Sequence, residues 1–142
     1  MYPEGILIGE AAKASGVKVP TIRYYEQIGL LPALPRTEGS RRIYNATDLQ
    51  RLAFIRHARE LGFEIEAIRT LLTLQGDPNQ TCSTADYIAK KHLEEVERRI
   101  ESLLALKVEL QLMVEGCAHG RIATCRVIEV LADHSQCRHE QH

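Results

Sequence analysis

Residues 19–31 read VPTIRYYEQIGLL, and this stretch decides the fold of the N-terminal part of the chain. Pro20 suits the first turn of a helix, where a backbone N–H has no intrahelical partner. Gly29 suits the position after a helix, where a left-handed backbone is common. The preceding ILIGEAAKASGV (residues 6–17) has helical spacing of apolar residues and stops at Gly16. Two short helices joined by a glycine-containing turn predict a helix-turn-helix.

A wing is predicted directly after this motif. Residues 32–44, PALPRTEGSRRIY, combine two prolines, a polar turn near Gly39 and an R-R-I-Y run, which predicts a small β-hairpin. Two more helices follow, over residues 45–63 and 64–75, and each has apolar residues on one face. Asn45 or Thr47 can cap the first of them. A helix-turn-helix with such a hairpin is a winged helix-turn-helix.

The longest predicted helix covers residues 84–116. Its apolar side chains recur every three or four residues, which predicts a coiled coil. Too little sequence remains to cover a helix of ~45 Å, so these side chains are expected to face a second copy of the chain. This apolar seam, interrupted only by Lys107, consists of Leu93, Val96, Ile100, Leu103, Leu110 and Val114.

Charge favours nucleic acid as the partner of the N-terminal part. Residues 1–59 carry nine Lys or Arg and five Asp or Glu, a net charge of +4, whereas residues 60–142 carry nine and fourteen, a net charge of −5. Arginine and tyrosine donors on a helix and a hairpin suit phosphates and base edges. The alternative is that Ile22 and Tyr24 belong to the core and that the arginines form a solvated face. The candidate DNA-contacting residues are Thr21, Arg23, Tyr24, Tyr25, Arg36, Arg41, Arg42 and Tyr44.

Three segments together resemble the MerR family of transcriptional regulators: IGEAAKASGVKVPTIRYYEQIGLL, the wing pattern R-x-x-x-x-R-R-I-Y, and LQRLAFIRHARELGFEIEAIRTLL. The resemblance implies a homodimer, joined by an antiparallel coiled coil, on a dyad operator in promoter DNA. Effector binding would distort that DNA and realign promoter elements for RNA polymerase. It also implies that Arg23 and Tyr25 contact DNA from the recognition helix and that Arg59 contacts a phosphate. The wing contacts that it implies are Arg36, Arg41, Arg42 and Tyr44.

The four cysteines indicate metal or redox chemistry. The N-terminus lacks the basic and long apolar regions of a signal peptide, and no apolar run approaches the ~18 residues of a membrane span. The chain is therefore expected in the cytoplasm and away from membranes, where thiols are more often metal or redox ligands than structural disulfides.

The positions of three cysteines predict a site shared between subunits. Cys82 lies just before the long helix and Cys117 just after it, so ~45 Å separates them within one chain. In an antiparallel dimer, Cys82 of one subunit approaches Cys117 and Cys125 of the other. Residues 116–125, GCAHGRIATC, must then leave the helix, because eight helical steps separate two thiols by ~12 Å. Three thiolates select soft or borderline ions.

The resemblance sharpens the identity of the effector. Copper(I) sensors of the family have Ser where Cys82 stands, whereas zinc, cadmium, lead and mercury sensors have Cys. A divalent ion of that class is therefore expected as the effector. His119 is either a fourth ligand, which would favour zinc, cobalt or cadmium, or an exposed loop residue, which would leave a three-thiolate site for mercury or lead. The tail is either a second metal site or disordered, and its candidate ligands are Cys137, His139 and His142.

Two other functions use the same thiols. A redox-sensing regulator would form a disulfide between Cys117 and Cys125 and keep the DNA-binding role. A thiol oxidoreductase would need a Cys-x-x-Cys pair and a βαβ frame, and the sequence has neither. The chain is therefore not expected to be an enzyme.

The predicted architecture is mostly α. Residues 1–76 form the winged helix-turn-helix domain with its connecting helices. Residues 77–116 form a linker and the dimerisation coiled-coil helix. Residues 117–142 form the metal-binding loop, a short helix and the tail.

Overall fold

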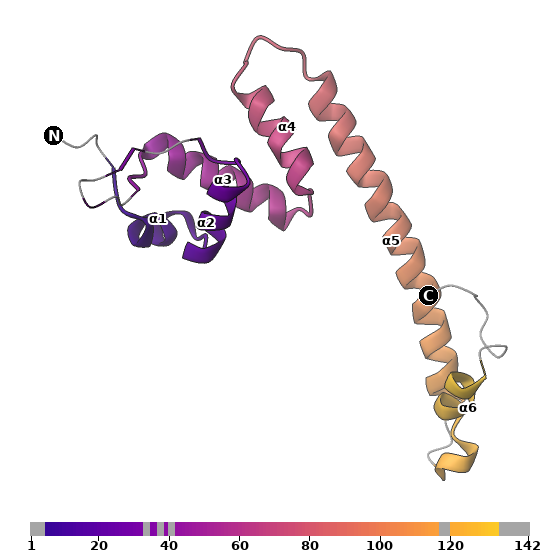
Figure 1. Ribbon diagram of the computed structural model, residues 1–142. Helices are drawn as coiled ribbons and strands as arrows, with labels where there is room; N and C mark the ends of the chain where they lie inside the picture. The colour runs from indigo at the N-terminus through magenta and orange to yellow at the C-terminus, as the bar shows by residue number, and fades with distance from the viewer. Residues whose placement is uncertain (1–4, 33–34, 37–38, 40–41, 117–119, 134–142) are drawn as a thin grey trace. The chain divides into compact units, whose positions relative to one another are not determined.

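The structure is a computed structural model of the 142-residue chain, and it describes residues 5–32, 35–36, 39, 42–116 and 120–133. The chain divides into two compact units, Met1–Ala85 and Asp86–His142. The predicted mostly helical fold is confirmed (Figure 1). The helices are α1 (Ile8–Ser15), α2 (Val19–Gln27), α3 (Ala46–Glu60), α4 (Ile65–Gln75), α5 (Ser83–Glu115) and α6 (Arg126–Ala132), with a 3₁₀ turn at Ile122–Thr124.

Helices α1 and α2 form the predicted helix-turn-helix, and Gly16 makes the turn between them. Gly16 has φ 75°, and its N–H donates to the carbonyl of Ala12. A Cβ at this position would meet the guanidinium of Arg56, the far end of a long side chain, which would have to shift. Pro20 lies in the first turn of α2, and Gly29 follows that helix with φ 79°. Both residues therefore have the roles that the sequence predicted.

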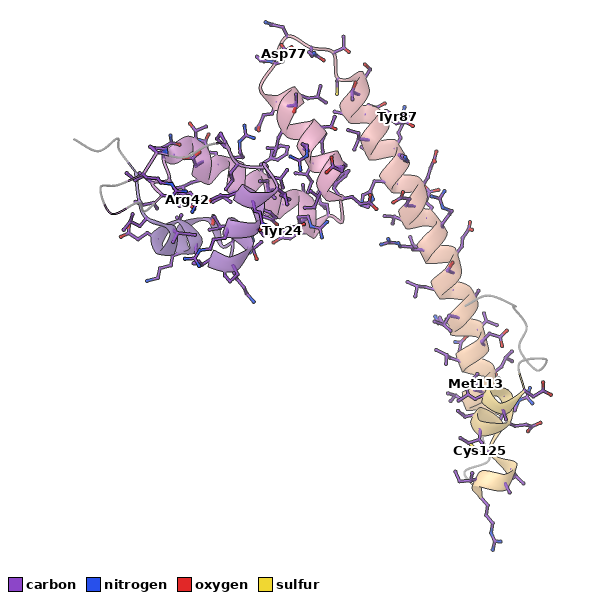
Figure 2. All side chains as sticks on the ribbon, in the orientation of Figure 1. Tyr24, Arg42, Asp77, Tyr87, Met113 and Cys125 are labelled. Atoms are coloured by element: carbon purple, nitrogen blue, oxygen red, sulfur yellow. The ribbon has the colours of Figure 1, made fainter. Side chains whose placement is uncertain are left out.

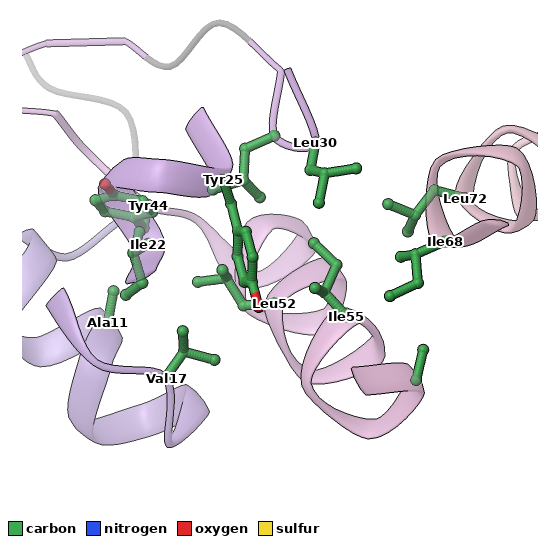
Figure 3. Packing of buried hydrophobic residues seen from close by; sticks show 12 residues of the cluster. Ala11, Val17, Ile22, Tyr25, Leu30, Tyr44, Leu52, Ile55, Ile68 and Leu72 are labelled. Atoms are coloured by element: carbon green, nitrogen blue, oxygen red, sulfur yellow. The ribbon is translucent and has the colours of Figure 1, made fainter. Parts of the chain in front are cut away.

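A single apolar core joins the four helices of the first unit (Figure 3). Figure 3 shows Ile68 and Leu72 of α4 pointing toward Leu30 and Ile55. Full burial of each such aliphatic side chain contributes ~1.5–3 kcal/mol. This packing holds α2 firmly against the other three helices. The largest side chains with less than 2% exposure are Ile22, Leu30, Tyr44, Leu52, Ile55 and Ile68.

Helix α3 begins with a capping box. The Asn45 side chain accepts a hydrogen bond from the Asp48 N–H, and the Asp48 carboxylate accepts one from the Asn45 N–H, both at 2.9 Å. Of the two predicted caps, the structure therefore uses Asn45. Gly62 follows α3 with φ 87°, as expected for a residue that ends a helix.

The wing is described at residues 32, 35–36, 39 and 42–44. These residues form one antiparallel bridge, Arg36 with Arg42, and the Ile43 N–H donates to the Pro35 carbonyl at 2.8 Å. A second bridge, Ile6 with Tyr44, attaches the base of the wing to the segment before α1. The described residues of the two arms are thus paired antiparallel, as in the predicted hairpin.

The second unit is built on α5, whose 33 residues span ~50 Å. The apolar seam is exposed in the single chain, and Leu103 and Val114 expose 63% and 69% of their surface. At the C-terminal end of α5, α6 lies beside its last turns (Figure 1), and Met113 and Val130 are buried there. Across the described ranges, no helix has the length and apolar character to cross a membrane.

Candidate nucleic-acid interface and metal ligands

The exposed face of α2 is the first part of the candidate DNA interface. Arg23 and Tyr24 are exposed on it, and Tyr24 exposes 49% of its surface, whereas Ile22 is fully buried. Of the alternative, the burial of Ile22 and the exposure of the described arginines are found, whereas Tyr24 does not belong to the core. Gln27 is exposed one helical turn after Arg23 and was not predicted. Its spacing of four residues from Arg23 was the signal, since such residues share a helix face.

A groove of 630 Å³ lies between α2 and the wing. Arg23, Glu26 and Gln27 line it from the helix, and Arg36 and Arg42 line it from the wing. Figure 2 labels Arg42 and Tyr24 among the side chains of this unit. Guanidinium groups donate to phosphate oxygens and to guanine edges. The structure thus gathers three of the predicted arginines around one concave, basic surface.

Glu26 connects the recognition helix to the wing. One carboxylate oxygen accepts a hydrogen bond from the Tyr44 hydroxyl, and the other lies 2.5 Å from Nε of Arg42. The Glu26 side chain is only 9% exposed, whereas that of Arg42 is 41% exposed. Burial, followed by the hydrogen bond to Glu26, raises the pKa of Tyr44 well above its ordinary value, so the phenol stays protonated as a donor.

The predicted DNA contact from Tyr44 requires correction. Tyr44 is fully buried (0% exposed), and a side chain without surface cannot touch DNA. An aromatic residue at the end of a basic hairpin resembles a contact residue in sequence. Its hydroxyl instead donates a hydrogen bond to the Glu26 carboxylate below the surface.

A second basic depression of 380 Å³ lies at the start of α2, and Lys18, Thr21, Tyr25, Arg56 and Arg59 contribute to its lining. Tyr25 is only 6% exposed, and it contributes to the lining of this depression. Burial raises the pKa of Tyr25, and the nearby Arg59 opposes that rise. Arg59 also donates from Nη1 to the Phe63 carbonyl at 2.8 Å, which anchors its guanidinium.

Two basic residues that line this depression were not predicted, Lys18 and Arg56. Lys18 is the residue directly before α2, and Arg56 lies three residues before Arg59 on α3. The spacing along α3 was available in the sequence, but the approach of α3 to the turn before α2 was not. The predicted Arg41 lies outside the described residues.

Two candidate metal ligands are described. Cys82 is exposed directly before α5, and Cys125 is half-buried directly before α6 (Figure 2). Neither is in a disulfide. Helix α5 ends at Glu115, before the predicted loop, and the described residues 120–125 contain a 3₁₀ turn at Ile122–Thr124 rather than a continuation of the α-helix. Outside the described residues lie the predicted ligands Cys117, His119, Cys137, His139 and His142.

The described residues contain no group of three or more His, Cys, Asp or Glu side chains that could hold an ion. Cys82 and Cys125 flank opposite ends of α5, a helix of ~50 Å. Both side chains are thiols outside disulfides, which is the donor chemistry that soft and borderline ions prefer.

The proteins that this chain resembles are transcription regulators. Residues 7–75 match the MerR HTH family regulatory protein model, and residues 49–113 match the model described as MerR, DNA binding. The chain is 44% identical over 128 residues to the HTH-type transcriptional regulator ZntR of Escherichia coli strain K12, covering 87% of this chain and 90% of ZntR. It is 41% identical over 128 residues to heavy metal-dependent transcription regulator 2 of Rhizobium meliloti, covering 90% and 87%. The crystal structure of PbrR691 from Ralstonia metallidurans in complex with lead(II) superposes with a TM-score of 0.79 at 34% identity, covering 89% of this chain and 98% of PbrR691.

Proposed function

The chain belongs to the MerR family of helix-turn-helix regulators, and we propose on this premise that its homodimer represses a promoter without metal and activates it by distorting the DNA when a divalent heavy-metal ion binds. It is a DNA-binding regulator rather than an enzyme. The observation that carries the proposal is the presence, in one chain, of an arginine-lined DNA-binding surface and of thiols at both ends of a long helix. Its similarity to heavy metal-dependent regulators and to a lead-bound regulator supports metal as the effector.

The DNA-binding surface consists of the two basic depressions and the face of α2 between them. Arg23, Arg36 and Arg42 act in the wing groove, and Tyr24 acts on the exposed face of α2. Thr21, Tyr25 and Arg59 act in the second depression. The predicted contact from Arg41 in the wing is retained as part of the proposal. A dimer presents this surface twice, which suits a dyad operator.

The apolar seam of α5 joins two copies in this proposal. Six large apolar side chains lie exposed along one helix, and single chains rarely leave such a stripe in water. An antiparallel pairing brings the start of one α5 to the end of the other. Cys82 then meets the partner subunit's Cys117 and Cys125, which completes a three-thiolate site at each end of the dimer.

Metal binding at such a site has a direct consequence for the dimer. A divalent ion bound by deprotonated thiolates joins the start of one long helix to the loop of the other chain. Cys125 directly precedes α6, and α6 packs on the last turns of α5. Ordering the loop therefore changes how α6 rests on the dimerisation helix. The ion shifts the dimer toward one DNA-bound shape only to the extent that it binds that shape more tightly.

The donor set selects among zinc, cadmium, lead and mercury. Three sulfurs without a fourth ligand favour mercury or lead, and participation of His119 favours zinc or cadmium. The tail residues Cys137, His139 and His142 are a second candidate site. The redox-sensing alternative has no support from the relatives, which include a heavy metal-dependent regulator and a regulator in complex with lead(II).

A competitive titration tests the effector. Reduced protein on its promoter is titrated with zinc, cadmium, lead and mercury, and transcription by RNA polymerase is measured. We expect one or more of these ions to induce transcription. Induction by a disulfide-forming oxidant, with no response to any of the four ions, would instead establish the redox function.

Replacement of Cys82 with Ser tests the shared site. We expect metal-induced transcription to collapse while promoter binding survives, because Cys82 lies outside the DNA-binding surface. A mixed dimer sharpens the test, with one subunit carrying Cys82→Ser and the other Cys117→Ser and Cys125→Ser. The shared site predicts one intact metal site in that dimer, and the loss of both sites would show that the ligands come from a single chain.

A further inference from the structure

Glu26 is a carboxylate in a groove that the proposed function assigns to DNA. Negative charge beside phosphates opposes binding, so this residue requires an explanation. Both of its oxygens are engaged by the wing, one by the Tyr44 hydroxyl and the other by Nε of Arg42. With 9% of its side chain exposed, the carboxylate lies beneath the groove rather than on its rim.

The wing itself poses a charge problem. Arg36 and Arg42 are paired across the antiparallel bridge. Directly opposed residues project from the same face, and like charges in that position repel. Glu26 lies within ion-pairing distance of Arg42 and supplies the opposite charge. Because the pair uses Nε, the terminal nitrogens of Arg42 can still donate to DNA.

We propose that Glu26 is a positioning residue for DNA recognition: its ion pair holds Arg42 of the wing in one orientation beside Arg23 of the recognition helix. Arg23 and Arg42 line the same groove, and the two elements that carry them are joined there by Glu26. Tyr44 keeps the carboxylate in place from below by donating to its second oxygen. The inference rests on the proposed function, because it concerns sequence-specific binding of double-stranded DNA.

The proposal predicts a loss of specificity rather than a loss of binding. Glu26→Gln keeps the size of the side chain and an acceptor for Tyr44, but it removes the charge that orients Arg42. We expect affinity for specific DNA to fall about tenfold, as for the loss of one charge-assisted hydrogen bond. Affinity for non-specific DNA should stay equal or increase, because a negative charge leaves the DNA-facing side.

The measurement uses full-length protein and two probes. The specific probe is a duplex that the wild-type protein selects from random-sequence DNA, and the non-specific probe is the unselected pool. The ratio of the two affinities is compared for wild type, Glu26→Gln and Glu66→Gln. Glu66 also forms an ion pair with an arginine, but on the exposed surface of α4, so its substitution is a matched change of charge outside the groove. We expect the ratio to fall only for Glu26→Gln.

A double-mutant cycle separates positioning from a general structural role. If Glu26 acts through Arg42, then adding Glu26→Gln to Arg42→Ala lowers the ratio no further than Arg42→Ala alone. Losses that add would overturn the proposal, as would an unchanged ratio in Glu26→Gln. If that variant fails to fold by circular dichroism, Arg42→Lys provides the test, because a single ammonium cannot pair with Glu26 and donate to DNA as the guanidinium does. An unchanged ratio for Arg42→Lys would then overturn it.

The wild-type measurement distinguishes the two levels of failure. A wild-type protein that does not prefer the selected duplex to the pool contradicts the proposed function itself. A wild-type protein that does prefer it, together with a Glu26→Gln variant of equal preference, contradicts only the role of Glu26.

Discussion

At the scale of single residues, Tyr24, Tyr25 and Tyr44 look alike in the sequence but have different environments. Tyr24 is half exposed, Tyr25 is mostly buried, and Tyr44 is entirely buried. A buried phenol must find a hydrogen-bond partner, because an unsatisfied polar group costs free energy. Tyr44 finds Glu26, and this partnership explains why a tyrosine is useful at a position that never meets solvent.

The pKa of Tyr44 leads to a prediction about pH. Burial raises this pKa above 10.0 in the folded protein, so the stabilisation from the neutral phenol is complete below pH 10 and is lost as the pH rises through the folded-state pKa. Tyr44→Phe should lower the free energy of unfolding at pH 8 by about 1.5–3 kcal/mol, the range for a hydrogen bond to a charged group. The difference from wild type should narrow above pH 10.

Urea denaturation at pH 8 and at pH 10.5 measures both effects. The narrowing is specific to Tyr44, because Tyr25 is present in both proteins and contributes equally to each. A constant difference between wild type and variant at the two pH values would contradict the buried, hydrogen-bonded phenol.

At the scale of elements, the turn between α1 and α2 favours glycine mainly for its backbone conformation and, to a smaller degree, for the space beside Arg56. Gly16 has a left-handed backbone, and Arg56 of α3 occupies the place of its Cβ. Nη1 of Arg56 also donates a hydrogen bond to the Ser15 carbonyl at 3.4 Å, directly before Gly16. The helix-turn-helix is therefore held by α3 as well as by its own turn.

Gly16→Ala should lower the free energy of unfolding by at least about 1–2 kcal/mol, the cost of a left-handed backbone for an L-residue. Gly9→Ala is the matched control, because Gly9 lies in α1 with nothing within 4 Å of its added Cβ. That substitution should be neutral or stabilising by up to about 1 kcal/mol. Thermal or urea denaturation followed by circular dichroism compares the two variants.

The double variant Gly16→Ala with Arg56→Ala separates the two reasons. Removing the guanidinium relieves the close contact but leaves the left-handed backbone, so part of the lost stability should return. Full recovery would mean that the backbone conformation contributes nothing, and no recovery would mean that Arg56 does not limit the space.

At the scale of the whole molecule, the central feature is the exposed apolar seam of α5. Leu93, Ile100, Leu103 and Leu110 each expose at least half of their surface in the single chain. Water penalises such a stripe, and a second copy offers a matching one. The proposed metal site has the same requirement, because only a partner subunit brings Cys82 to the end of another α5.

Substitutions in the seam should therefore change assembly. Leu103→Lys places a charge in the interface of both subunits and should shift the protein toward monomer, whereas Glu101→Lys, at an exposed position outside the seam, should leave it dimeric. Lys107→Leu repairs the one polar break in the seam and should tighten the dimer. Sedimentation equilibrium measures all three.

The same variants connect assembly to metal. A monomeric Leu103→Lys protein should lose tight metal binding although all its cysteines remain. If it binds the ion as tightly as wild type does, the ligands do not come from two subunits.

Most of the fold could be predicted from the sequence, because its signals are local. The starts and ends of the helices depend on the local backbone preferences of single residues, here Gly16, Pro20, Asn45 and Gly62. The spacing of the apolar seam likewise identifies α5 without any tertiary contact. The basic character of α2 and the wing is likewise visible residue by residue, as are the thiols next to α5. The approximate helix bounds could be predicted for this reason, and the candidate DNA-binding residues and metal ligands could be named.

Tertiary structure alone decided which of these side chains face solvent and which face one another. Glu26 and Arg42 are sixteen residues apart, and Gly16 and Arg56 are forty apart, so no helical or strand period relates them. Their pairing follows from how α2, α3 and the wing pack around one core. In that packing, Tyr44 lies beneath the surface on which the sequence placed it. Its ring is buried in the core, and its hydroxyl donates to Glu26, the one carboxylate on α2.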